Sequence, residues 1–221
     1  FATDSDWNIV NNTGTASEII NGYARIKTDG AYTQIDQPNV TIAAKSYKLQ
    51  YTISESDGGS LGFIITGNQT ASIPTTVGTH IYYFVANSTS IVFKRFSGVL
   101  DVKIDNVSVK EVGQDWSLET GWSIGDGSLV ANSVTTGLAF QSNIVEANKS
   151  YKATYSVVVT SGSVGLYFDG GTGYQGVVTT TQTITVFFKA TTTSPLYFRS
   201  NTSNFTGSIT NISVKEVGQD W

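Results

Sequence analysis

The chain carries an identical internal repeat, and this repeat sets its domain organisation. The eight residues from Val109 to Trp116 recur letter for letter from Val214 to Trp221. The offset is 221 − 116 = 105 residues, which is too long for a solenoid unit and matches a whole domain. The sequence therefore predicts two folded modules, residues 1–113 and 114–221. Because the second copy stops where a third module would begin, we expect a piece of a longer repetitive polypeptide.

Each module has the composition and turn signals of a β protein. Aromatic residues make up 12% of the chain, charged residues only 14%, and Cys is absent. Asn21-Gly22 and Asp126-Gly127 lie between alternating residues, a strong signal for a hairpin. No helical period is present. We predict an all-β fold: two tandem antiparallel β-sandwich domains of jelly-roll type, each with about eight short strands.

Alternation at period two predicts which strand residues face the core. The odd-numbered positions from Tyr47 to Ile53 are apolar or aromatic, and the segment from Tyr151 to Val157 repeats this pattern. The same analysis places four side chains away from the core: Ile64, Tyr83, Tyr167 and Phe187. Such side chains need a functional or structural reason.

Two further features concern the ends of the modules. Trp7 and Trp116 open the modules, and we expect each to pack the first strand onto its sandwich. In the last strand of module one, the apolar positions change from even to odd numbers at Asp105-Asn106. This change predicts a β-bulge.

Charge and residue inventory exclude several classes of function. A net charge of −4 and a pI near 4.9 argue against a nucleic-acid partner, and no apolar stretch is long enough for a membrane span. His80 is the only histidine and Cys is absent, so the chain has too few of these residues for a Cys-His catalytic pair or a His-rich metal site, and only one histidine for a catalytic triad. The acids shared by the repeats, Glu111 with Glu216 and Asp115 with Asp220, fall at the module junctions. We predict that the chain is not an enzyme.

The modules resemble a known family in four places. These are a Trp near the start, an Asn-Gly or Asp-Gly hairpin, Lys45-Ser46-Tyr47 or Lys149-Ser150-Tyr151 entering a central strand, and the ending from Ile104 to Val112. Together they resemble CenC-like jelly-roll carbohydrate-binding modules. The ending followed by Gly-Gln-Asp-Trp is similar to modules strung together in tail-fibre and other structural proteins of environmental, often marine, bacteriophages.

This resemblance implies a galactose-binding-like sandwich that holds glycans with aromatic rings and amide side chains. It also implies a structural calcium bound partly by Asp105, whose counterpart in module two is Thr210. No other cofactor is expected.

Glycan binding requires a flat aromatic ring against the apolar face of a sugar, with planar polar groups for its hydroxyls. Side chains off the core phase or in loops are the candidates. They are Tyr32, Gln34 and Tyr83 in module one, and Phe140, Gln141, Tyr167 and Tyr174 in module two. The structural alternative is that Tyr83 or Phe187 covers a sheet against a neighbouring subunit.

The sequence leads to the hypothesis of a non-enzymatic repeat module of a phage virion appendage or surface fibre. It would be extracellular or on the virion surface, would bind cell-surface glycans, and would gain from multivalency along the polypeptide. Two alternatives stay open. One is a purely structural module that assembles with its own copies or with other virion proteins, and the other is the accessory carbohydrate-binding region of a secreted polysaccharide-degrading enzyme.

Overall fold

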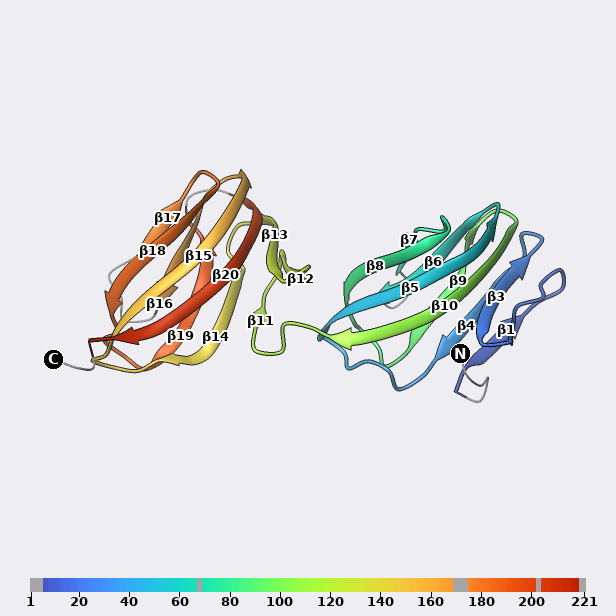
Figure 1. Cartoon of the computed structure of the whole chain (residues 1–221), viewed down its shortest axis with the longest axis horizontal. Helices are drawn as coiled ribbons and strands as arrows, with labels where there is room; N and C mark the ends of the chain where they lie inside the picture. The colour runs from blue at the N-terminus through green and yellow to red at the C-terminus, as the bar shows by residue number, and fades with distance from the viewer. Residues whose placement is uncertain (1–5, 67–68, 169–174, 202–203, 219–221) are drawn as a thin grey trace. The chain divides into compact units, whose positions relative to one another are not determined.

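The chain divides into two compact units, Phe1–Val112 and Gly113–Trp221, each built from strands and loops (Figure 1). The computed structural model describes residues 6–66, 69–168, 175–201 and 204–218. Within these ranges each unit has ten strands, two more than the sequence pattern predicted. No helix of the described residues has the length and hydrophobicity to cross a membrane.

The first unit consists of two five-stranded antiparallel sheets. Their strand orders are β1-β4-β9-β6-β7 and β2-β3-β10-β5-β8. The strands are β1 (Asn8–Asn11), β2 (Glu18–Ile20), β3 (Tyr23–Thr28), β4 (Thr33–Gln37), β5 (Ser46–Asp57), β6 (Ser60–Thr66), β7 (Gln69–Ile73), β8 (Gly78–Val85), β9 (Ile91–Ser97) and β10 (Leu100–Glu111).

The second unit repeats this topology, with each strand number raised by ten. Its sheets have the orders β11-β14-β19-β16-β17 and β12-β13-β20-β15-β18. The strands are β11 (Ser117–Leu118), β12 (Trp122–Gly125), β13 (Ser128–Val134), β14 (Leu138–Val145), β15 (Ser150–Ser161), β16 (Val164–Phe168), β17 (Gln175–Val178), β18 (Gln182–Lys189), β19 (Ser194–Ser200) and β20 (Phe205–Val217). The predicted all-β fold of two tandem antiparallel sandwiches is confirmed.

Each unit buries its own hydrophobic core between its two sheets. In β5, Leu49, Tyr51 and Ile53 are fully buried, as the alternating pattern predicted. Phe63 of β6 and Phe84 of β8 join the two sheets, with ring centroids 4.9 Å apart. Contacts of this kind keep the sheets at a fixed separation and leave the alternate residues of every strand on the two outer faces.

The module-opening tryptophans lie where the sequence placed them. Trp7 packs against Phe93 with ring centroids 6.4 Å apart, and Trp116 stacks on Phe198 at 6.0 Å. Each indole therefore anchors the start of its unit to the core.

The predicted bulge and hairpins are also confirmed. The pairing of β10 with β5 shifts register between Asp105 and Ser108, and Asn106 there has a φ of 50°. Asn tolerates this left-handed conformation better than most residues, so it suits the extra residue of a bulge. Asn21 and Gly22 both have positive φ and join β2 to β3, as a two-residue hairpin requires.

The edge strands β1 and β11 were harder to predict. All four residues of β1 are exposed, so no buried phase marks the segment as a strand. Its extended form comes from pairing with β4, where Asn8 lies opposite Asp36 and Asn11 opposite Thr33. This partner is distant in sequence, and a local pattern does not reveal it.

Candidate functional site

Three aromatic side chains lie side by side on the outer face of the β11-β14-β19-β16-β17 sheet. The register places Phe140 of β14 opposite Tyr197 of β19, and Tyr197 opposite Tyr167 of β16. The ring centroids of Phe140 and Tyr197 are 6.2 Å apart, and those of Tyr167 and Tyr197 are 5.6 Å apart. Phe140 meets Tyr197 edge on, whereas Tyr167 and Tyr197 are stacked. We call these three residues the aromatic row.

The strand phase directs the aromatic row away from the core. Leu196 and Phe198, the neighbours of Tyr197 in β19, are fully buried, so Tyr197 must point outward. It is nevertheless only 8% exposed, because a ring flanks it on either side. The sequence analysis singled out Phe140 and Tyr167 but missed Tyr197. Alternation along Leu196, Tyr197 and Phe198 could have indicated that Tyr197 points outward. All three residues are apolar or aromatic, however, so the sequence shows no polar residue that marks the outer face.

The first unit does not carry this row. At the equivalent positions of β4, β9 and β6 it has Asp36, Val92 and Ile64. The outer face of the equivalent sheet is therefore polar and aliphatic at these positions. Any binding that depends on the aromatic row belongs to the second unit.

Two other predicted residues, Tyr32 and Gln34, meet on this equivalent face of the first unit. The Tyr32 hydroxyl donates to Gln34 Oε1, Gln34 Nε2 donates to Asp36 Oδ1 at 3.0 Å, and Asn8 Nδ2 donates to Asp36 Oδ2 at 3.1 Å. Burial raises the pKa of the Tyr32 hydroxyl, and the Asp36 carboxylate adds to this rise. These polar groups already satisfy one another, so a sugar would have to compete with an internal network.

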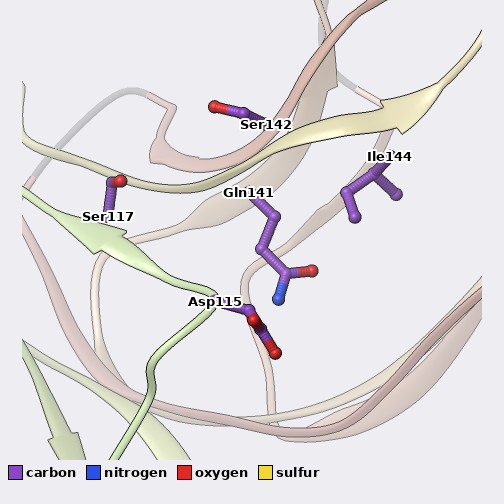
Figure 2. Close-up of a pocket in the computed structure, with 5 residues that line it drawn as sticks. All are labelled: Asp115, Ser117, Gln141, Ser142 and Ile144. Carbon is purple, nitrogen blue, oxygen red and sulfur yellow. The ribbon is translucent and has the colours of Figure 1, made fainter.

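A pocket of about 510 Å³ lies in the second unit, against β11 and β14 (Figure 2). Ser117, which lines it, lies opposite Phe140 in the pairing of β11 with β14. Its lining residues are Asp115, Ser117, Gln141, Ser142 and Ile144. Figure 2 shows the Gln141 amide and the Asp115 carboxylate pointing toward one another. Carboxylate and amide side chains are groups that hydrogen-bond sugar hydroxyls. The structure thus brings the predicted Gln141 together with Asp115 in this pocket. Because Gln141 pairs with the buried Leu196, it lies on the opposite face of β14 from Phe140 and is not part of the aromatic row's surface.

The remaining glycan candidates lie elsewhere. Tyr83 is on β8, on the outer face of the other sheet of the first unit, and is not part of a cluster with Tyr32 and Gln34. Tyr174 lies outside the described residues. Among the candidates of the first unit, Tyr83 therefore lies on a different sheet from Tyr32 and Gln34.

Asp105 lies at the bulge of β10, where its Oδ1 accepts a hydrogen bond from the Asn106 backbone N–H at 2.6 Å. The described part of the chain contains no group of three or more His, Asp or Glu side chains that could hold a metal ion. A calcium cage built from several acidic side chains does not fit these surroundings. Calcium binding by Asp105 stays a prediction from the resemblance.

No protein-family model and no curated protein matches the chain. Among solved structures, it is similar to the tandem CBM22-1-CBM22-2 domains of Paenibacillus barcinonensis Xyn10C, with 8% identity, 97% of this chain and 94% of that chain covered, and a TM-score of 0.36. The secreted serine protease VesC from Vibrio cholerae gives 8% identity, 91% and 51% coverage and a TM-score of 0.34. A Paenibacillus xanthan lyase gives 13% identity, with 95% of this chain and 24% of that chain covered, and a TM-score of 0.33. The sandwich fold of this chain follows from its own strand pairing.

Proposed function

We propose that the chain is a non-enzymatic glycan-binding repeat module whose second unit binds a sugar on the aromatic row. The observation that carries this proposal is the alignment of Phe140, Tyr197 and Tyr167 across three adjacent strands. Aromatic rings offer a flat apolar surface that matches the apolar face of a pyranose. Because the side chains stand on paired strands, the surface is ordered before the ligand arrives, which lowers the entropic cost of binding.

The members of the site have different roles in this proposal. Tyr167 and Phe140 contact the sugar, while Tyr197 lies between them and fixes their positions. Ser117, which lies opposite Phe140 and therefore on the same face, hydrogen-bonds a hydroxyl group of this sugar, while Asp115 and Gln141 line the pocket on the other side of β14 and hold a further residue of the glycan. Selectivity among sugars would come from these directional polar contacts, since stacking alone tolerates many rings.

We further propose that the module belongs to a phage virion appendage or another surface fibre and binds cell-surface glycans. Support comes from the tandem repeat and from the module ending that resembles such fibres. The chain would then lie outside the cell or on the virion surface, joined to further repeats of the same polypeptide or to other virion proteins. Repeated weak sites along one polypeptide would give a higher avidity than any single site.

A purely structural role is the second candidate, and it is favoured for the first unit. Asp36, Val92 and Ile64 replace the aromatic row there, and Tyr32 and Gln34 hydrogen-bond within the unit. The two units would then have different roles: the first acts as a spacer and the second binds the glycan.

A glycan array probed with the purified two-unit chain tests this proposal. We expect selective binding that weakens at least about tenfold in Tyr167→Ala, the loss of roughly 1.4 kcal/mol of binding free energy. The matched control is Tyr32→Ala, which removes a tyrosine from the corresponding face of the first unit and should change affinity less than about twofold. Circular dichroism verifies that both variants are folded. Absence of selective binding, or loss in Tyr32→Ala with retention in Tyr167→Ala, would overturn the assignment of the site.

A further inference from the structure

The outer face of the other sheet in the first unit carries a row of one aromatic and two basic side chains. Lys48 of β5 lies opposite Tyr83 of β8 on one side and opposite Lys110 of β10 on the other. Lys48 Nζ is 5.9 Å from the centroid of the Tyr83 ring. All three side chains point away from the core, because they alternate with buried positions such as Leu49.

The second unit carries the same row at the equivalent positions. Lys152 of β15 lies opposite Phe187 of β18 and opposite Lys215 of β20. Lys152 Nζ is again 5.9 Å from the ring centroid, and Phe187 is 67% exposed. We call each set of one aromatic ring and two lysines a lysine row.

No carboxylate of the described residues forms an ion pair that would balance the charges of the lysine rows. Like charges directly opposite one another on neighbouring strands destabilise a sheet. None of the four lysines makes an ion pair with a carboxylate among residues 6–66, 69–168, 175–201 and 204–218. By contrast, the nearby Lys45 and Lys149 pair with Glu111 and Glu216 at 3.5 and 3.0 Å. In a chain with a net charge of −4, each row is thus a local positive site open to an external anion.

The lysine row is present in both units, whereas the aromatic row is not. Lys110 and Lys215 lie within the identical repeated octapeptide, but the other members lie outside it. Between Lys48 and Tyr51 the intervening residues are Leu49-Gln50, and the second unit has Ala153-Thr154 at these places. Lys48 and Lys152 both follow the stretch Lys-Ser-Tyr, and each faces a ring, Tyr83 or Phe187, at the equivalent position, so both units keep the two lysines and the ring together as a set.

We propose that each lysine row binds an anionic saccharide, with the two ammonium groups pairing with a carboxylate or sulfate and the ring packing on the apolar face of the sugar. The exposed ring favours a saccharide over a simple anion, because a bare anion gains nothing from an apolar surface. In the second unit, Thr154 and Thr185 lie opposite one another at the next outward-facing positions of β15 and β18, and their hydroxyl oxygens are 3.2 Å apart in a hydrogen bond. This proposal does not depend on the aromatic row, which lies on the other sheet.

Biolayer interferometry on immobilised polysaccharides tests the proposal with the two-unit chain. The probes are alginate, a polyuronate, and dextran sulfate, with unmodified dextran as the uncharged match. We expect binding to alginate and dextran sulfate that weakens with added salt, and none to dextran. A variant with Lys48→Gln, Lys110→Gln, Lys152→Gln and Lys215→Gln should bind both polyanions at least about tenfold more weakly.

The control variant removes the same number of positive charges elsewhere: Lys27→Gln, Lys45→Gln, Lys94→Gln and Lys149→Gln. It should keep its affinity for alginate within about twofold. Equal losses in the two variants, or no binding of the wild type to either polyanion, would refute the proposal. The Tyr167→Ala variant should bind alginate as tightly as the wild type does. The experiment therefore tests the lysine row separately from the proposed sugar site on the aromatic row.

Two further arms separate a saccharide from other anionic partners. Tyr83→Ser with Phe187→Ser should weaken binding to alginate but not the weak, salt-sensitive attraction to polyglutamate. If polyglutamate or phosphatidylserine vesicles bind more tightly than alginate, the row recognises an acidic peptide or a membrane surface and the assignment to a saccharide is wrong.

Discussion

The stacked contact between Tyr167 and Tyr197 is the element of the aromatic row whose energy can be measured most directly. Their ring centroids are 5.6 Å apart and their planes are inclined by 24°. Aromatic pairs of this kind contribute about 0.5–1.5 kcal/mol beyond the burial of their area. We therefore expect that Tyr167→Ala and Tyr197→Ala together destabilise the second unit by about 1 kcal/mol less than the sum of the single variants.

The control cycle combines Tyr167→Ala with Phe187→Ala, which lies on the outer face of the opposite sheet. Because the whole sandwich separates these side chains, their effects should add within about 0.5 kcal/mol. The single variants also differ in size: Tyr197→Ala should be the more destabilising, since Tyr197 is 8% exposed and loses contacts on both sides.

Urea unfolding followed by tryptophan fluorescence measures these free energies. In a Trp7→Phe background, the remaining tryptophans, Trp116, Trp122 and Trp221, all belong to the second unit. The signal then reports that unit. A coupling below about 0.3 kcal/mol for Tyr167 and Tyr197 would show that the rings do not support one another. The argument that the row is a rigid platform for a sugar would then fail.

Three further predictions concern the sandwich itself. Tyr51→Phe and Tyr155→Phe each remove a buried hydroxyl that donates to a backbone carbonyl at 2.9 and 2.8 Å, so each should lower the free energy of unfolding by about 1–2 kcal/mol in urea titrations. The hydrogen bonds from Arg25 lower the pKa of Asp101, so this carboxylate stabilises the fold above its unfolded pKa of about 3.9 and stops doing so as the pH falls through its lower folded pKa. The stability difference between the wild type and Asp101→Asn should accordingly shrink between pH 7 and pH values of about 2 to 3, as unfolding measured across that range will show. If Asp105 binds calcium, EDTA lowers the melting temperature of the wild type but not of Asp105→Asn. Equal melting curves of the wild type with and without EDTA would show that the protein binds no stabilising calcium.

Local periodicity was sufficient to predict the fold class and the direction of most strand side chains. In β5 and β16 the residues assigned to the core, such as Leu49 and Leu166, are fully buried, and Tyr167 lies on the opposite face. The bulge at Asp105-Asn106 was readable for the same reason, because one inserted residue inverts the alternation that follows it. These features depend only on neighbouring residues in one strand.

The grouping of candidates into sites could not be obtained in this way. Phe140 and Tyr167 were both predicted as glycan-binding candidates, yet nothing local shows that β19 lies between β14 and β16 and contributes Tyr197. The same holds for Lys48, whose two partners come from strands far apart in the sequence.

The sequence by itself therefore determined the two modules, their all-β class and the face on which a given side chain lies. Only the tertiary structure decided which outward-facing side chains are neighbours, and it separated the aromatic row from the lysine rows. The physical reason is that strand phase follows from the geometry of one extended segment, whereas strand order and register follow from long-range pairing and the packing of a shared core.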